Sequence, residues 1–428
     1  MPFRIALSGL NAASADLKVT GNNIANASTT GFKSSRAEFA DVYATSLGGV
    51  SSTAVGGGVR MTRVAQQFSQ GNIEFTSNNL DLAVNGEGMF ILSDSGSISY
   101  TRSGAFSVDR DGYVVNSMNQ RLQVFQPIGG SSSEFDTGSL SDLQISLTEG
   151  APRATSNVGL ALNVDAGDTS AGAVGSFDPA DASTYNYSTS FTVYDSLGTQ
   201  HTATTYYLKD SSNANTWYAW LYVDDGSGTP QRVDFTSGGT TYEYATLVFN
   251  TDGTLDTGSS SGTNGSVSYD ALSLAGTTGA ADLTLTLDYS SLTQYGSDYA
   301  VNALSQDGYA TGRLTGLDIS DTGVVSARYT NGQSTSLGKV ALANFPNVQG
   351  LRQLGDTAWA ETYSSGDRLI GEAGTASFGL IQSGALEASN VDISEQLINL
   401  ITAQRNFQAN SQVISTADTI TQTIINIR

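Results

Sequence analysis

Cysteine is absent from this chain, which excludes disulfide bonds, thiolate metal sites and a cysteine nucleophile. Thiol-derived crosslinks between subunits are excluded for the same reason. Basic residues are scarce: 19 Lys and Arg stand against 40 Asp and Glu, which gives a net charge of −21. Because nucleic-acid phosphates are bound by clustered Lys and Arg, this charge argues against a nucleic-acid partner.

Long apolar runs are also lacking. No run approaches the roughly 20 residues that a membrane-spanning helix needs, so we expect no membrane insertion. The amino-terminal apolar stretch is interrupted by Ser8, Asn11, Ser14 and Asp16, which differs from the continuous apolar segment of a cleaved signal peptide. Taken without further information, this pattern predicts a cytoplasmic protein that starts without a cleaved signal.

Heptad spacing organises the amino-terminal segment 2–33. One set of apolar residues recurs every seven positions: Phe3, Leu10, Leu17 and Ile24. A companion set follows three positions later, and Leu7 widens the stripe: Ala6, Ala13, Thr20 and Ala27. This pattern predicts a helix with an a/d seam on one face. Such a helix is marginal alone in water, so it needs a partner to pack against.

The carboxy-terminal segment 391–428 repeats the pattern. Its seam residues are Ile393, Leu400, Phe407 and Ile414, with Ala403, Ala417 and Ile424 as companions and Leu397, Ile401, Ile420 and Ile425 on the flanks. Asp392 stands where a helix start favours a carboxylate cap. Neither Pro nor Gly follows Asn390. The sequence therefore predicts a second long helix.

Two interpretations of these seams remain open. The helices can form a hairpin within one monomer, or they can pack laterally between subunits. Two helices alone leave about half of each seam in water, which favours packing between subunits. The predicted polymer interface is Phe3, Leu7, Leu10, Leu17, Ile24, Ile393, Leu397, Leu400, Phe407, Ile414, Ala417 and Ile424.

Between the helices the apolar period changes to two, which is typical of strands. The segment between Glu134 and Asp298 holds 20 acidic and three basic residues, so −17 of the total charge is local. It also contains aromatic-rich strands and Gly-containing turns. We expect an independent acidic β domain with Trp217, Trp220, Phe191 and Tyr206 in its core.

Enzymatic and metal-binding alternatives find little support in the sequence. His201 is the only histidine and lies within a predicted strand, where an ordinary exposed side chain is expected in preference to a triad member. Asp109, Asp111 and Gly112 lack the distal Glu of a calcium loop, so they predict a turn. A secreted β-rich adhesin or binding module would suit the Tyr-rich middle, but heptads at both ends argue against it. We expect no catalytic residue, cofactor or metal.

Several sequence blocks resemble the signatures of bacterial flagellar rod and hook axial proteins. The blocks are SGLNAA (8–13), VTGNNIAN (19–26), TGFK (30–33), NLDLAVNGEGMF (79–90), YTRSGAF (100–106), GALE (384–387), SNV (389–391) and QRNFQ (404–408). Rod proteins of this family are shorter and lack a large acidic insert, and YDSLGTQH (194–201) resembles a block of hook proteins. The resemblance thus implies a hook subunit, with a distal rod-type axial protein as the alternative.

This resemblance implies a multidomain α+β fold in which nested, mainly-β domains are inserted between terminal helices that form a coiled-coil-like tail. The expected domains are 1–27 plus 391–428 (helical tail), 28–70 plus 364–390 (extended connector), 71–148 plus 290–363 (inner β domain) and 149–289 (acidic outer β domain).

For function, the resemblance implies a structural subunit that self-assembles into a curved tube and transmits torque as a flexible universal joint. The implied partners are further copies of the chain, hook cap, distal rod and hook–filament junction proteins, and the flagellar type III export apparatus. That apparatus would deliver the subunit outside the cell without a cleaved signal peptide.

Overall fold

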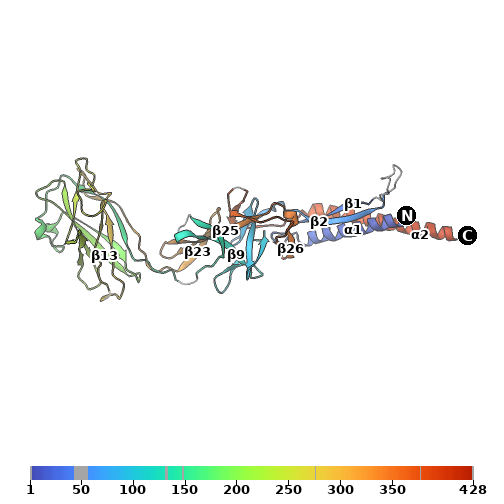
Figure 1. Ribbon diagram of the computed structural model, residues 1–428, viewed down its shortest axis with the longest axis horizontal. Coiled ribbons are helices and arrows are strands. Elements are labelled where there is room, and N and C mark those ends of the chain that lie inside the picture. Colours follow the sequence, from blue (N-terminus) through green and yellow to red (C-terminus); the bar gives the residue numbers. More distant parts are fainter. Residues whose placement is uncertain are drawn as a thin grey trace. The chain divides into compact units, whose positions relative to one another are not determined.

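The computed structural model describes residues 2–42, 56–130, 134–146, 149–274, 276–375 and 377–426 (Figure 1). The chain forms two compact units. The first comprises Met1–Leu147, Thr315–Arg328 and Ser334–Arg428, and the second comprises Thr148–Leu314 and Tyr329–Gln333. The first unit contains both long helices and a large sheet, whereas the second is built from strands and short 3₁₀ turns. The described chain is therefore mainly β with a helix at each end.

The terminal helices are α1 (Pro2–Ala25) and α2 (Ile393–Asn426). Asp392 caps the start of α2, because its Oδ1 accepts hydrogen bonds from the backbone N–H groups of Ser394 (2.7 Å) and Glu395 (3.2 Å). The two helices pack side by side (Figure 1). Asn23 bonds Gln396, and Gly9 lies against Asn410, so the helices run antiparallel.

A hairpin of β1 (Ser35–Asp41) and β2 (Val59–Gln66) packs along α1. The Asn23 side chain bonds both backbone groups of Ser35, and the Ser8 hydroxyl accepts a hydrogen bond from the N–H of Val59 at 3.2 Å. The predicted extended connector 28–70 therefore contains regular structure, which its Gly- and Ser-rich composition did not indicate. Residues 43–55 of that connector lie outside the described residues.

Two short antiparallel pairs join distant parts of the chain near the base of the helices. β3 (Ile73–Phe75) pairs with β30 (Ala385–Glu387), and β4 (Leu82–Asn85) pairs with β29 (Leu380–Ser383). They bring the chain after β2 beside the chain that leads into α2. The predicted connector 364–390 thus also contains strands.

The large sheet of the first unit is assembled from segments on both sides of the second unit in the sequence. Strands β9 and β25 meet at its centre, where Val124 is opposite Val340. Its described strands are β5 (Met89–Asp94), β6 (Ser97–Thr101), β7 (Ser107–Val108), β8 (Val114–Val115), β9 (Arg121–Pro127), β10 (Phe135–Asp142), β23 (Leu314–Ile319), β24 (Val324–Tyr329), β25 (Ser334–Asn344), β26 (Arg352–Gly355), β27 (Ala358–Ala360) and β28 (Leu369–Glu372). A buried core on this sheet includes Ile91, Tyr100, Phe125, Ala341 and Trp359.

The second unit has two larger sheets and a small hairpin. One sheet contains β11 (Asn157–Asp165), β19 (Ser266–Ser268), β20 (Thr286–Asp288), β21 (Thr293–Tyr295) and β22 (Ala300–Gln306). The other contains β12 (Tyr187–Tyr194), β13 (Gln200–Lys209), β14 (Thr216–Val223), β15 (Gln231–Val233) and β18 (Ala245–Val248). The hairpin is β16 (Phe235–Ser237) with β17 (Thr240–Tyr242). The 3₁₀ turns η2 (Val174–Ser176) and η3 (Ala182–Thr184) belong to this unit, whereas η1 (Ile128–Gly130) and η4 (Val348–Gly350) belong to the first.

Side chains from both larger sheets of the second unit share one buried core. The predicted boundary at residue 289 is too early, because β21 and β22 both pair with β11. Residues 290–314 therefore belong to the second unit. β22 pairs with six of the nine residues of β11, from Val158↔Gln306 to Asn163↔Ala300, so it is part of the same sheet.

The predicted aromatic core divides between two faces of one sheet. Trp217 and Phe191 are buried in the shared core, as predicted. Trp220 instead points to the opposite face, where Phe177 stacks on it with ring centroids 4.1 Å apart. Tyr206 pairs with Trp220 across the strands and shares that face. The cause is the two-residue strand period, which sends positions 217 and 220 to opposite sides.

We expect residues 149–314, expressed alone, to fold cooperatively, because they contain both larger sheets and their common core. A shorter fragment, 149–289, is the matched control. It lacks β22, so β11 loses an entire neighbouring strand and the control should be unfolded or far less stable. Near-ultraviolet circular dichroism and thermal melting distinguish the two. An unfolded longer fragment, or equal stability of both fragments, would contradict the assignment of 290–314 to this unit.

Candidate assembly site

Small side chains form the contact between α1 and α2. Ala6, Ala13, Thr20 and Ala403 are all buried there. At Gly9 the missing side chain leaves room for the Asn410 carboxamide of α2, which a Cβ at this position would displace. The small companion residues of the heptads thus pack the two helices of one chain against each other.

The predicted interface residues fall into two groups. Four are exposed: Phe3, Leu7, Ile393 and Leu397. Seven are half-buried: Leu10, Leu17, Ile24, Leu400, Phe407, Ile414 and Ala417. The Ile424 side chain lies outside the described residues. The half-buried group therefore flanks the intramolecular contact, while the exposed group has large apolar surface that the chain itself does not cover.

Further apolar side chains on the helices are exposed and were not among the predicted interface residues. They are Ile5, Ile398, Ile401, Val413, Ile420 and Ile425. Adjacent apolar pairs such as Leu397-Ile398 are the sequence signal for them, because neighbours on a helix point in directions about 100° apart. With the four exposed predicted residues, these six form what we call the exposed apolar stripe.

Part of this stripe borders a groove of about 740 Å³. The groove lies between the beginning of α1 and the second half of α2, and Phe3, Val413 and Ile420 line it. A soluble monomer rarely leaves many large apolar side chains on one pair of helices open to water. The groove and stripe together indicate a surface that another helix can cover.

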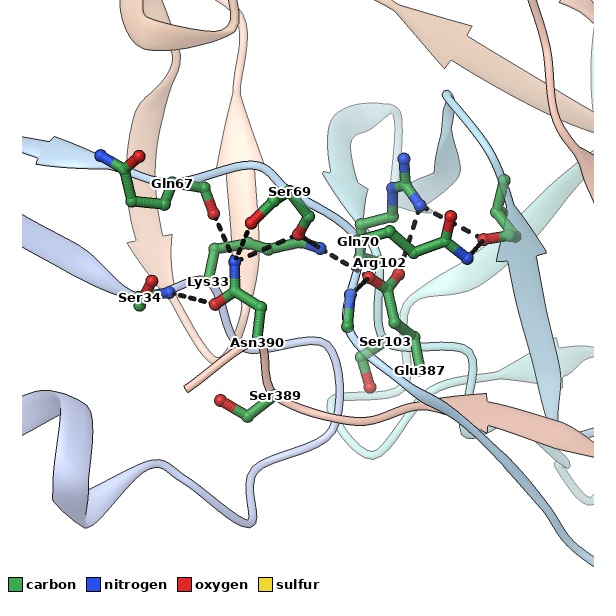
Figure 2. Close-up of polar contacts among 12 residues, drawn as sticks. Lys33, Ser34, Gln67, Ser69, Gln70, Arg102, Ser103, Glu387, Ser389 and Asn390 are labelled. Atoms are coloured by element: carbon green, nitrogen blue, oxygen red, sulfur yellow. Dashed lines mark hydrogen bonds and ion pairs between the residues drawn. The ribbon is translucent and has the colours of Figure 1, made fainter. Parts of the chain in front are cut away.

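A buried ion cluster lies at the base of the helices (Figure 2). The Glu387 carboxylate is fully buried, and it accepts hydrogen bonds from Lys33 Nζ (2.6 Å), the N–H of Gly71 (2.8 Å) and Arg102 Nη1 (3.2 Å). Lys33 Nζ also donates to the Ser69 carbonyl at 2.8 Å. One carboxylate therefore ties together the chain after α1, the chain after β2, the large sheet and the chain before α2.

Asn390 adds a second set of bonds beside this cluster (Figure 2). Its Oδ1 accepts from the N–H of Ser34 at 2.7 Å, and its Nδ2 donates to the carbonyls of Gln67 (2.8 Å) and Ser69 (3.1 Å). The cluster and this asparagine join the chain after α1 and the chain before α2 to the strands of the first unit.

Burial lowers the pKa of Lys33, and the adjacent Glu387 carboxylate opposes that shift. Burial likewise lowers the pKa of Arg102, again opposed by Glu387. Charges withdrawn from water are tolerated only when they are paired and hydrogen-bonded, so both cations depend on this one carboxylate. Close packing supports the pairing: Gly31, two residues before Lys33, has a φ of +69°, and a Cβ there would come within 2.5 Å of the Ser103 backbone nitrogen.

His201 was expected to be exposed, and that prediction is wrong. The side chain is buried, with Nδ1 2.8 Å from the Asp224 carbonyl oxygen and Nε2 3.3 Å from Asp195 Oδ2. His201 and Ala203 are two residues apart in β13, so both side chains point to the same, buried face of the strand. Both ring nitrogens are occupied, so neither can activate a nucleophile, and the histidine instead fixes the turn that begins at Asp195.

The turn predicted at Asp109 is confirmed, since Asp109 Oδ1 accepts hydrogen bonds from the N–H groups of Asp111 (2.9 Å) and Tyr113 (2.7 Å). Within the described ranges, no group of three or more His, Asp or Glu side chains is arranged to hold a metal ion. Among the helices that the structure describes, none combines the length and apolar character needed to cross a bilayer.

Four family profiles match successive parts of the chain. "Flagella basal body rod protein" matches residues 3–33, and "Flagellar hook protein FlgE/F/G D1 domain" matches 83–158. "Flagellar basal body protein FlaE D2 domain" matches 162–309, and "Flagellar basal body rod FlgEFG protein C-terminal" matches 382–427. The D2 profile lies within the second unit, and the two rod profiles cover the helices.

Known proteins similar to this chain include the flagellar hook protein FlgE of Escherichia coli K12, 36% identical over 100% of both chains. FlgE of Rhizobium meliloti is 34% identical over 100% of this chain and 98% of its own, and FlgE of Borreliella burgdorferi is 32% identical over 99% and 98%. The crystal structure of Helicobacter pylori flagellar hook protein FlgE2 aligns with a TM-score of 0.54, 16% identity and coverage of 74% of this chain and 100% of that chain, which shows a shared fold. On the evidence of full-length identity above 30%, the chain belongs to the flagellar hook protein FlgE family.

Proposed function

We propose that this chain is the structural subunit of a bacterial flagellar hook, and that it assembles through its terminal helices into a curved tube. The tube acts as a flexible universal joint that transmits torque from rod to filament during motility. The subunit is a structural protein and not an enzyme. Membership of the hook protein family supports this role.

The exposed apolar stripe on α1 and α2 is the observation that carries the proposal. In the isolated chain the antiparallel helix pair leaves large side chains such as Leu397 and Ile398 in water, 45% and 64% exposed. Full burial of such a side chain contributes roughly 1.5 to 3 kcal/mol, so covering the exposed half contributes roughly 0.7 to 1.5 kcal/mol, and every subunit of a polymer repeats the gain. The pair also carries few charges, so close lateral packing costs little desolvation. Its described charged residues are Arg4, Asp16 and Lys18 on α1 and Glu395, Arg405 and Asp418 on α2.

In this proposal the paired helices form the coiled-coil-like tail that lines the tube, and the cluster at Glu387 holds the tail to the strands of the first unit. The second unit carries a dense acidic charge and makes weak, polar contacts that break and re-form as the curved tube rotates. The proposed partners are further copies of the chain, together with the hook cap, distal rod and hook–filament junction proteins. The flagellar type III export apparatus delivers the subunit outside the cell.

Sedimentation of the purified chain tests this proposal. Above a critical concentration, we expect long tubes that pellet, with a fixed concentration of free subunit left in the supernatant. A fragment without α2, residues 1–390, is the control and should remain soluble at every concentration. A chain that stays monomeric at high concentration and on seeding with sheared tubes would contradict the proposal, as would polymers from the fragment without α2.

A further inference from the structure

Tyr363 stands on the first unit with its whole side chain in water. Its relative exposure is 103%, the largest among the exposed apolar and aromatic residues of the described chain, and its ring contacts no other aromatic ring there. A tyrosine with no contact of its own gains nothing from being held in this position within the monomer. The surroundings of the ring show that it is nevertheless held.

Side-chain hydrogen bonds hold the loop beneath Tyr363. Thr362 Oγ1 donates to the Gly350 carbonyl at 2.6 Å, and Ser365 Oγ donates to the Thr362 carbonyl at 2.7 Å and accepts from the Thr362 N–H at 2.9 Å. Asn347 Nδ2 donates to the Ser364 carbonyl at 2.8 Å. Ser365 is fully buried. The loop therefore forms a pedestal of side-chain hydrogen bonds that holds its one aromatic residue outward.

Such an arrangement is what a binding anchor requires. A tyrosine supplies large contact area with only two side-chain torsions to immobilise, and a preformed loop removes most of the ordering cost of binding. Tyrosines of this kind are frequent among the few residues that dominate interface energy.

The same unit has a hollow of about 330 Å³ whose chemistry matches a tyrosine. Its apolar wall consists of Phe68, Met89, Phe345, Pro346 and Val348. Its polar lining consists of Glu87, Asn344 and Arg102. Arg102 is buried and bonds Val84, Gly86 and Glu387, whereas Glu87 is exposed. An aromatic ring can pack on the apolar wall, and a phenol hydroxyl can donate a hydrogen bond to the Glu87 carboxylate.

We propose that Tyr363 of one subunit inserts into this hollow of a second copy of the chain, and so forms an intersubunit contact separate from the helices. The inference rests on the proposed hook function, because it requires many copies in one assembly. The hollow borders the pedestal, because Pro346 and Val348 line it and Asn347 between them bonds the Ser364 carbonyl. If each subunit gives its Tyr363 to one neighbour and receives the Tyr363 of another, the contact is head-to-tail and propagates through an open helical polymer. The contact gives adjacent first units a defined, reversible attachment.

Substitution at position 363 tests the anchor by sedimentation. Tyr363→Ala should raise the critical concentration about 10- to 100-fold, because an anchor residue of this type is lost. Tyr363→Phe should fall between alanine and wild type, since only the hydroxyl contact is removed. Tyr242→Ala is the matched control, an exposed tyrosine of the second unit whose ring already stacks on Phe235, and it should leave the critical concentration unchanged. Monomer melting should be unaltered by Tyr363→Ala, which excludes a folding defect.

Photo-crosslinking identifies the surface that position 363 contacts in the polymer. With p-benzoylphenylalanine at position 363, tubes should yield dimeric crosslinks to peptides that contain Met89 or residues 345–348. Crosslinks to other surfaces, crosslinks within one chain only, or none would overturn the proposal, as would unchanged polymerisation of Tyr363→Ala. The wild-type chain is the control in the same experiment. If it forms tubes but position 363 gives no such crosslink, the Tyr363 contact is wrong; if it forms no tubes, the proposed hook function itself is wrong.

Discussion

Replacing Leu397 with aspartate is expected to abolish sedimentable polymer at concentrations where the wild-type chain assembles, while the melting curve of the free subunit stays unchanged. Leu397 belongs to the exposed apolar stripe and is 45% exposed in the isolated chain. Full burial of a leucine side chain contributes roughly 1.5 to 3 kcal/mol, and about half of this is still to be gained at position 397. The substitution therefore removes roughly 0.7 to 1.4 kcal/mol at each interface and adds a desolvation penalty of at least about 1 to 3 kcal/mol. Since each 1.4 kcal/mol is a factor of ten, the critical concentration should rise at least about 15-fold.

The matched control for this prediction is Gln408→Asp, an exposed polar position on the same helix, where the cost should be small. Leu400→Asp supplies a second comparison. Leu400 is half-buried beside α1, so aspartate there should part the two helices as well as block assembly. Normal tubes from Leu397→Asp would show that the intersubunit contact lies elsewhere, and a lowered subunit melting temperature would show that Leu397 stabilises the monomer.

Glu387→Gln is expected to loosen the base of the helices. The amide keeps the size of the side chain, yet it leaves Lys33 and Arg102 buried without their counter-ion. Removing one partner of a buried ion cluster costs about 3 to 5 kcal/mol. Amide hydrogens in β3 and β30 should therefore exchange roughly 100- to 1,000-fold faster in assembled tubes, and the tubes should dissociate at lower temperature.

An exposed pair gives the control for this second prediction. Glu38 bonds Arg63 at 2.7 Å on the β1–β2 hairpin, and more than half of that arginine side chain is exposed. Exposed ion pairs contribute little because water screens them, so Glu38→Gln should leave exchange in β3 and β30 unaltered. Equal effects of the two substitutions, or slow exchange in Glu387→Gln, would show that the ion cluster does not stabilise the base of the helices.

The periodicity of the helices predicts part of the assembly site. The seven-residue repeat predicts two helices and the small residues between them, such as Ala13 and Ala403, which the structure buries. It does not distinguish the face that meets the other helix of the same chain from the face left for a neighbour. Both faces are apolar, and Leu397 and Ile398 differ by only one position in the sequence.

The ion cluster and the burial of His201 were not predicted from the sequence. Lys33, Arg102 and Glu387 are far apart in the chain, and only the pairing of β3 with β30 and the turn at Gly31 bring them together. His201 carried a usable signal, because the two-residue period places it on the same face as Ala203 and Tyr207. A polar residue in a strand was assumed to face water, although period alone decides the face.

Cryo-electron microscopy of tubes from the purified chain tests the central claim most directly. We expect an open helical polymer with a central channel, in which α1 and α2 of each subunit pack antiparallel and the exposed side chains Leu397, Ile398 and Ile420 contact the helices of neighbouring copies. A closed ring, a globular monomer, or a tube whose subunit contacts leave this stripe in water would contradict it.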